Sequence, residues 1–304
     1  MHRRTHVDAF GATILVAFSM LLGLNQVMVK WVNVGLQPVF QAGLRSACAF
    51  LPVLLFALVM RRRISLSDGS FWPGLACGLI FSIEFMFLFQ ALDYTSVSRV
   101  SVLFYTMPFW VALGAHFLIP GEHLTPRRVL GLVLAIAGVV LAFTDQSAAA
   151  SDRALLGDVM CLLGAMCWAA IALLARASAL SKSSPEMQLL YQLAVSSVVL
   201  IALAPLFGDL VREPTVRIWG IFAVQVLLVV CVGFLTWFWI LSIYPASDMA
   251  SFGFLAPLFG VLFGWLLLDE TISPSIIGAL VLVGTGIVLV NRRTATRAGS
   301  GPEA

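Results

Sequence analysis

The stretch that decides the fold reads ALDYTSVSRVSVLFYTMPFWVALGAHFLIPGEHLTP and covers residues 91–126. A second copy, ILSIYPASDMASFGFLAPLFGVLFGWLLLDETISP, covers residues 240–274. Pro108 of the first copy aligns with Pro257 of the second at an offset of 149 residues. A segment that recurs in this way predicts a chain built from two copies of one unit.

The correspondence extends well beyond this stretch, at offsets that stay between 146 and 149 residues. Further matched pairs are Lys30 and Arg176, Pro38 and Pro185, Gln41 and Gln188, Arg45 and Gln192, Glu122 and Glu270, and Gly138 and Gly286. We therefore expect a first repeat at residues 8–145, a second repeat at residues 152–291 and a polar tail at residues 292–304.

The repeated pattern resembles the drug/metabolite transporter superfamily, specifically its EamA-like members. The residues that carry the resemblance are the AL-x-Y-T segment at Ala91–Ser98, the paired prolines Pro108 and Pro257, and the loop glutamates Glu122 and Glu270, each ahead of a Thr/Ser-Pro helix start. The resemblance covers nearly the whole chain. It implies a membrane transporter that exports amino acids or related metabolites, and it leaves the solute itself open.

The composition indicates an integral membrane protein. Hydrophobic residues make up 61% of the 304 and charged residues only 11%, whereas a soluble domain has about 25% charged residues. The formal net charge of +3 is small and gives no indication of a nucleic-acid partner. The five cysteines lie inside apolar runs without metal-ligand spacing, so we expect no metal and no other cofactor.

Ten apolar segments of roughly 20 residues can be drawn, which is the length that crosses ~30 Å of hydrocarbon. Each is continuously apolar, which favours helices over the alternating strands of a barrel. The first follows MHRRTHVDAF without a cleavage site and is expected to be a retained helix. The segments cover residues 10–32, 37–60, 70–92, 96–118, 126–144, 154–179, 185–207, 217–241, 246–268 and 274–291.

Basic residues predict the orientation of these helices. Twelve of the 18 Lys and Arg residues would lie on the side that carries both termini, and six on the other side or within spans. The excess of positive charge places both termini in the cytoplasm and the protein in the cytoplasmic (inner) membrane. Because five spans per copy is an odd number, the second copy must be inverted. The predicted fold class is an all-α integral membrane protein with ten transmembrane helices in two inverted five-helix repeats.

Glu84 is the outstanding polar residue inside a span. A charged residue at a helix centre costs about 2.5–3.5 kcal/mol, so it is a functional candidate by default. Arg45 lies at the same predicted depth, ~12 Å below the outer boundary at 1.5 Å per residue. Asn25, Gln41 and Tyr105 lie near that level. This cluster could bind the solute or couple transport to protons; alternatively, Glu84 and Arg45 form a buried pair that only fixes helix packing.

The second copy replaces these charges with neutral residues. Gln192 stands where the first copy has Arg45, and Gln188 and Gln192 form a polar stripe on one helix. The stripe could line the solute path or provide hydrogen bonds between helices. Trp168 lies deep in its span and could stack on a solute ring or fill the core.

Pro108 and Pro257 are predicted to lie mid-helix in matching places. There each would remove a backbone hydrogen bond and kink the helix, as a hinge beside the solute path or as a static feature of packing. Glu122 and Glu270 are expected to stabilise the positive ends of the helices that follow them.

Two further predictions concern the starts of helices and the packing between them. Three helices should begin with a hydroxyl cap followed by proline, at Thr125, Ser184 and Ser273. A stripe of small residues, Gly131, Ala135, Gly138 and Ala142, permits close helix approach. It should either pack the two copies together or form the face of a homodimer.

The function predicted from these observations is secondary transport of a small organic solute by alternating access. An integral membrane enzyme is disfavoured, because no Walker A motif, metal-spaced histidine cluster or G-x-S-x-G elbow occurs. A broad-specificity drug efflux protein and a passive solute channel stay open as alternatives.

Overall fold

The structure is a computed structural model that describes residues 7–145, 153–244, 249 and 252–291. The predicted tail at residues 292–304 and most of the joint between the repeats, residues 146–152, lie outside the described residues. Throughout the described part the chain is helical, apart from turns, loops and one isolated bridge between Leu36 and Val211.

The first half of the chain forms six helices, and the second half continues the pattern. The first six are α1 (Ala9–Asn33), α2 (Pro38–Val59), α3 (Phe71–Tyr94), α4 (Val97–Phe104), α5 (Met107–Leu118) and α6 (Pro126–Phe143). The second half contains α7 (Ala154–Ala177), η1 (Ala179–Lys182), α8 (Pro185–Leu203), η2 (Ala204–Phe207), α9 (Val216–Val224), η3 (Gln225–Gly233), α10 (Phe234–Ile243), α12 (Leu255–Leu268) and α13 (Pro274–Asn291).

The described helices fit a membrane protein. Nine helices in the described part of the chain are long and apolar enough to cross a bilayer when α4–α5, α8–η2 and α9–η3 are each taken as one, and α12 is a shorter apolar helix. The predicted span at residues 246–268 is therefore described mainly through α12, because most of its first part lies outside the described residues. The prediction of an all-α fold with membrane-spanning helices is confirmed.

The expected hydroxyl caps are present. Thr125 Oγ1 accepts a hydrogen bond from the Arg128 N–H at the start of α6, and Ser184 Oγ accepts one from the Met187 N–H at the start of α8. Ser273 does the same for α13. A proline follows each cap at the first helical position, where it gives up no helix hydrogen bond.

Both prolines, Pro108 and Pro257, lie inside their predicted spans, but each follows an interruption of the helix and does not lie within a continuous one. The fourth span breaks between Phe104, where α4 ends, and Met107, where α5 begins. Pro108 lies in the first turn of α5, and Pro257 is the third residue of α12. Near a helix start the first N–H groups have no partner within the helix, so neither proline needs to kink a continuous helix.

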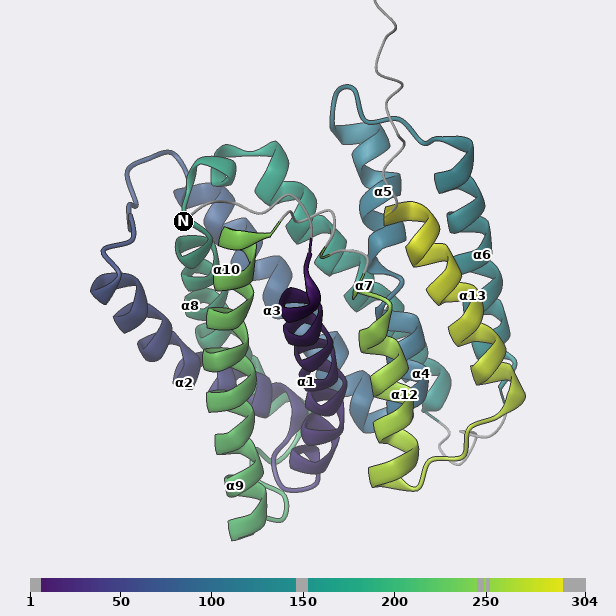
Figure 1. Ribbon diagram of the computed structural model, residues 1–304. Coiled ribbons are helices and arrows are strands. Elements are labelled where there is room, and N and C mark those ends of the chain that lie inside the picture. Colours follow the sequence, from purple (N-terminus) through teal and green to yellow (C-terminus); the bar gives the residue numbers. More distant parts are fainter. Residues whose placement is uncertain (1–6, 146–152, 245–248, 250–251, 292–304) are drawn as a thin grey trace, which may run out of the picture.

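The stripe of small residues on α6 packs against α13 and so joins the two halves of the chain (Figure 1). A Cβ on Gly138 would lie 2.8 Å from Val283 Cγ2 and 3.0 Å from the Ala279 carbonyl oxygen. Gly131 meets Val290 and the Gly286 carbonyl in the same way. Because this face of α6 is buried against α13 within the chain, it is not available as the contact surface of the predicted homodimer.

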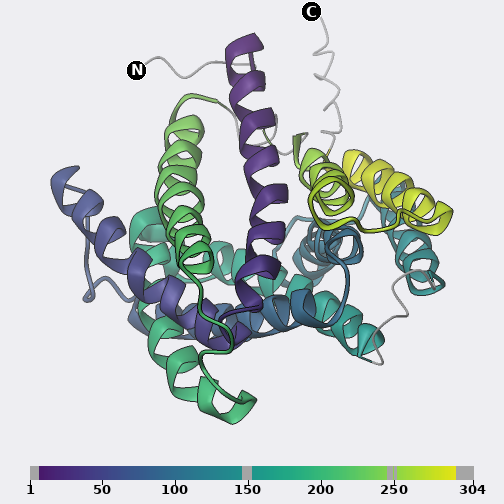
Figure 2. The same ribbon diagram turned by 90° about the horizontal axis from the view of Figure 1, so that it is seen from below.

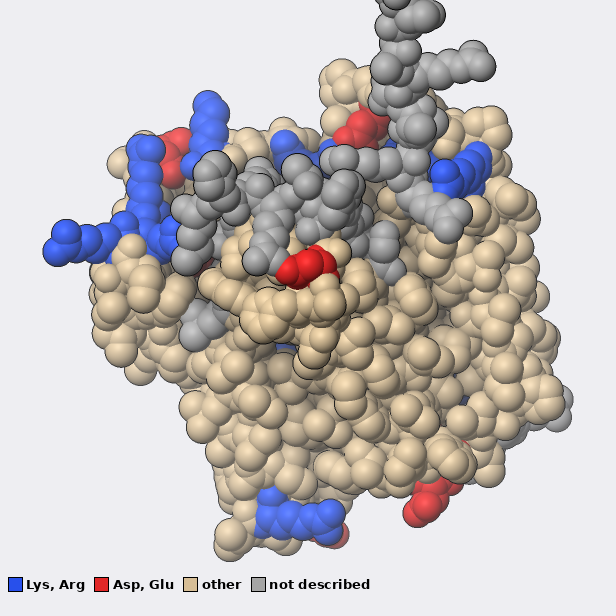
Figure 3. All heavy atoms as spheres, in the orientation of Figure 1, with Lys and Arg blue, Asp and Glu red and all other residues tan. Residues whose placement is uncertain are grey.

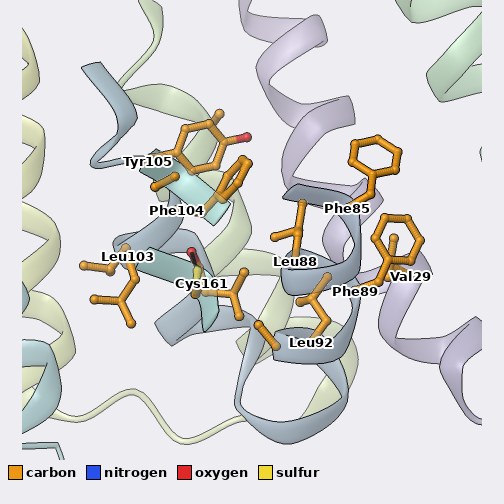
Figure 4. Packing of buried hydrophobic residues seen from close by; sticks show 14 of the residues in the cluster. Val29, Phe85, Leu88, Phe89, Leu92, Leu103, Phe104, Tyr105 and Cys161 are labelled. Carbon is orange, nitrogen blue, oxygen red and sulfur yellow. Dashed lines mark hydrogen bonds between the residues drawn. The ribbon is translucent and has the colours of Figure 1, made fainter. Parts of the chain in front are cut away.

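The helices form two groups around α1 (Figure 2). One group contains α2, α3, α8 and the column α9–η3–α10, and the other contains α4, α5, α6, α12 and α13, with α7 packed along α3 between them. The main hydrophobic core runs through α3, α4 and α7, where Leu88, Phe104 and Cys161 lie together (Figure 4). Gly23 lets α1 lie directly against α12 near Gly260.

The column α9–η3–α10 contains an unusual segment. Residues Gln225–Gly233 form a π-helix of nine residues between two α-helices. π-Helical turns are rare and are often found at functional sites. The last residue of this segment, Gly233, is the repeat equivalent of Glu84, so the second repeat has no carboxylate at this position.

Candidate functional site

Arg45 is buried on α2 and is held by neighbours on two other helices. Its side chain is 7% exposed, and its Nη1 donates a hydrogen bond to Asn25 Oδ1 on α1 at 3.2 Å. Its guanidinium carbon lies 5.2 Å from the ring centre of Phe85 and 5.5 Å from that of Phe89, both on α3. Figure 4 shows these two rings one turn apart along α3. Cation–π attraction and the amide together orient the guanidinium.

Glu84 is enclosed without a partner. It is 2% exposed, and its Oε2 is a fully buried oxygen with no hydrogen bond among the described residues. Its backbone lies against α7 at Gly164, where a Cβ would approach the Glu84 carbonyl oxygen to 3.7 Å. The charges of Glu84 and Arg45 attract each other, but no ion pair joins them in the described part of the chain.

Gln41 reaches the second repeat instead of this charged cluster. Its Nε2 donates to Gln225 Oε1 at 3.4 Å, across the contact between α2 and η3. Both side chains are fully buried, and Gln41 Oε1 and Gln225 Nε2 have no hydrogen-bond partner among the described residues. Gln225 was not predicted, although an amide inside an apolar span is the signal that could have identified it.

Tyr105 and Trp168 lie on the other side of α3. Tyr105 occupies the break between α4 and α5 and is 8% exposed, and its hydroxyl points toward α3 in Figure 4. The ring centre of Phe104 lies 6.0 Å from that of Tyr105 and 6.5 Å from that of Trp168. Trp168 is 38% exposed, so it does not fill the core.

The two predicted glutamines of the second repeat have local partners. Gln188 Nε2 donates to the carbonyl oxygens of Leu180 and Ser183, at 2.9 and 3.4 Å, and so secures the turn before α8. Gln192 Nε2 lies 3.5 Å from Cys77 Sγ on α3. The structure does not bring either residue into contact with Arg45.

A buried ion pair that the sequence reasoning missed joins α4 to α7. Arg99 donates to both oxygens of Asp158, through Nε at 3.1 Å and through Nη2, and Thr95 Oγ1 donates to the same carboxylate at 3.0 Å. Arg99 Nη1 also donates to the Asp145 carbonyl oxygen at 2.5 Å. With both charges satisfied, this group stabilises the helix contact. Its signal was Asp158, an acidic residue inside an apolar span.

Glu270 has a different role from the one expected. Its carboxylate accepts hydrogen bonds from Val97 N at 2.7 Å, Ser98 N at 2.9 Å and Ser98 Oγ at 2.7 Å, so it caps α4 and not α13. Lys30 Nζ lies 4.0 Å from Glu270 and donates to the Thr95 carbonyl oxygen at 2.5 Å. We call Glu270, Lys30 and the first turn of α4 the clasp. It joins the last two helices of the second repeat to the first repeat.

The repeat counterparts of the clasp residues also form an ion pair. Glu122, the equivalent of Glu270, pairs with Arg176, the equivalent of Lys30. This pair lies at the end of the molecule that carries the α5–α6 loop, opposite the end with the α12–α13 loop (Figure 1). On the face shown in Figure 3, most basic side chains gather at the end with the α5–α6 loop. The expected roles of both glutamates at their following helices are replaced by contacts between the repeats.

Known proteins resemble this chain along most of its length. A probable amino-acid metabolite efflux pump of Escherichia coli is 27% identical and matches 91% of this chain and 95% of its own. An uncharacterized transporter of Bacillus subtilis is 24% identical and matches 90% and 94%. A solved crystal structure with 18% identity shares the fold, with a TM-score of 0.64 over 92% of this chain and 96% of that chain.

The family assignment rests on a match to both repeats. The family model described as the EamA-like transporter family matches residues 9–144 and again residues 155–292. The two matches fall on either side of the joint between the helical halves. Together they cover most of the chain, and the membrane-spanning helices agree with them. The chain therefore belongs to the EamA-like transporter family.

Proposed function

We propose that this transporter exports amino acids or related metabolites by alternating access. The observation that carries the proposal is the state of Arg45 and Glu84, two charged side chains buried within membrane-spanning helices and short of partners. Buried ions cost several kcal/mol unless they are paired, so a site of this kind is retained for a ligand or a proton. The relative named as a probable amino-acid metabolite efflux pump supports the choice of solute class.

The packing of repeat-related helices supports two inverted repeats. Helix α2 packs against its counterpart α8, and α6 packs against its counterpart α13. Helix α1 lies against α12, as α7 lies against α4 and α5. A two-fold axis in the membrane plane would produce such equivalent contacts, in which each helix packs against the counterpart of its neighbour in the other half. Such an axis lets one site open alternately to either side.

The two ion pairs at opposite ends fit the same scheme. In the proposed orientation, with both termini in the cytoplasm of an inner-membrane protein, the clasp faces outward and the Glu122–Arg176 pair faces inward. In the clasp, Lys30 and Glu270 are 29% and 11% exposed, whereas Arg176 and Glu122 are 49% and 31% exposed, so the clasp is the more shielded of the two pairs. A closed outer end and a looser inner end are the features of a carrier that receives its solute from the cytoplasm.

Proton coupling is part of the proposal and is assigned to Glu84. A carboxylate without a fixed partner can take up and release a proton as the surrounding helices move, and it would then link solute export to the proton gradient.

The test is transport by purified protein in sealed liposomes. Vesicles loaded with labelled amino acids should release them faster when a pH gradient is imposed, and unlabelled amino acid outside should accelerate exchange. Flux that follows only the solute gradient and shows no exchange would point to a passive channel. Release of apolar dyes in place of amino acids would point to a broad drug efflux protein. Either result would overturn the proposal.

A further inference from the structure

Arg45 keeps most of its hydrogen-bonding capacity although it is buried. A guanidinium has five N–H donors in one plane, and within the described part of the chain only the bond to Asn25 uses one. The nitrogens without a partner are not among the fully enclosed polar atoms, so the unpaired edge reaches accessible space. Such an edge matches the two oxygens of a carboxylate.

The carboxylate of Glu84, in turn, lacks hydrogen-bond donors among the described residues. No donor reaches either carboxylate oxygen among the described residues, and only Oε2 is fully enclosed. Its other oxygen is therefore open to a ligand. An ionised carboxylate can only accept hydrogen bonds, and an ammonium group is the cation that offers three donors from a single atom. The site therefore lacks an anionic group to pair with Arg45 and a cationic group to pair with Glu84.

The two charges are too far apart to satisfy each other and near enough to attract. No ion pair joins Arg45 to Glu84, although each lies within the electrostatic reach of the other. An anionic ligand would pair with Arg45 and leave Glu84 unsatisfied, and a cationic ligand would do the reverse. A ligand that carries both charges a short distance apart satisfies both side chains and adds no net charge to the membrane interior.

We infer that Arg45 binds the carboxylate of the solute and Glu84 binds its ammonium group. The solute class is then a zwitterion, such as an amino acid. This inference rests on the proposed function and adds which residue recognises which end of the solute. Asn25, Phe85 and Phe89 are positioning residues, because they orient the guanidinium.

The repeat predicts one such site per chain. The equivalents of Arg45 and Glu84 in the second half are Gln192 and Gly233, and neither carries a charge. The structure also gives Gln192 a local contact with Cys77. A two-fold pair of zwitterion sites is therefore excluded, and one solute should bind per polypeptide.

The first test uses the wild-type protein in detergent and three matched ligands. The amino acid that most raises the melting temperature is selected from the proteinogenic L-amino acids. It is then compared with its amide, which lacks the carboxylate, and with its des-amino acid, which lacks the ammonium. Loss of one partner from a buried charge pair should weaken binding roughly 30-fold or more. Equal affinity for all three compounds would overturn the inference.

The second test changes the two residues separately. Arg45→Gln, which introduces the residue found at the equivalent position 192, should bind the amino acid and its amide equally. Glu84→Gln should bind the amino acid and its des-amino analogue equally. Gln192→Ala is the matched control and should keep the wild-type order of the three ligands. A structural role would weaken all ligands by the same factor, which would also overturn the inference.

The outcomes separate this inference from the proposed function. Gradient-driven export of amides or des-amino acids at the same apparent affinity would leave a transporter of another solute class and remove the zwitterion site. Binding with the expected ligand order but no flux in liposomes would leave the site intact and refute the transport proposal. If a variant does not fold, the wild-type ligand series still decides the question.

Discussion

The clasp should hold one end of the transporter shut, and Glu270→Gln is the change that tests it. Glutamine keeps the shape of the side chain but removes the charge and replaces one acceptor oxygen with a donor. The three donors of α4 at 2.7, 2.9 and 2.7 Å would then face one oxygen and one NH₂ group. Lys30 would also lose the opposite charge that lies 4.0 Å away.

The expected effect can be worked from these contacts. A hydrogen bond to a charged group contributes about 1.5–3 kcal/mol, and the helix end adds about 0.3–1 kcal/mol for a nearby negative charge. Glu270 is 11% exposed, so solvent screening removes only part of this. We expect a loss of about 2–3 kcal/mol from the closed end that carries the clasp, which shifts the open fraction about 30- to 150-fold.

The assay follows the exposure of a residue one turn beyond the clasp. Ser101 is fully buried and touches α12, where a Cβ on Gly260 would lie 2.0 Å from its Oγ. In a cysteine-free protein with Ser101→Cys, an impermeant maleimide added outside should react faster when Glu270→Gln is present. Gly264→Ala should act similarly, because its Cβ would lie 2.6 Å from Glu270 Oε2.

The control is Glu122→Gln, which removes the equivalent carboxylate at the opposite end. Its pair with Arg176 is partly exposed and contributes little, so this variant should not accelerate external labelling. An unchanged labelling rate in folded Glu270→Gln would refute the reasoning, because it would mean that the clasp does not set the closure of this end. Equal acceleration by both variants would refute it as well.

Three further predictions follow from the described contacts. Asp158→Asn should lower the free energy of unfolding by about 3 kcal/mol, because Arg99 stays buried with a neutral amide; denaturant unfolding of the purified protein measures this, and wild-type stability would contradict it. Gly138→Val should cost about 1–3 kcal/mol by forcing α6 from α13, while Gly284→Val, which meets no atom within 4 Å, should cost much less; equal melting temperatures would be inconsistent with the packing described. Glu84→Gln should abolish proton-driven accumulation but keep exchange at saturating solute, and full gradient-driven activity would remove the coupling role from this residue.

The sequence by itself determined the class of the protein and the local chemistry of its helices. Long apolar runs exclude every alternative to membrane-spanning helices, because backbone groups in lipid must be satisfied within the segment. Thr125, Ser184 and Ser273 cap helices as expected, since a cap depends on residues only three positions apart. Contacts of such short range can be read from the order of residues alone.

The repeat also predicted pairs of equivalent residues. Lys30 and Glu270 interact, and so do Arg176 and Glu122, although the sequence analysis paired none of them. A sequence shows which residues correspond, but it does not show which half of the molecule each one contacts. Glu270 caps a helix 172 residues away, and only the packing of α12 against α4 could place it there.

Tertiary structure alone decided the state of the charged cluster. Depth along separate helices placed Glu84 and Arg45 at one level, but depth carries no information on the rotation of each helix. The structure turns Arg45 toward Asn25 and the rings of Phe85 and Phe89, and within its described part it gives Glu84 no hydrogen-bond partner. Helix rotation is set by packing over the whole surface, so whether two buried charges neutralise each other or await a ligand is a property of the folded chain.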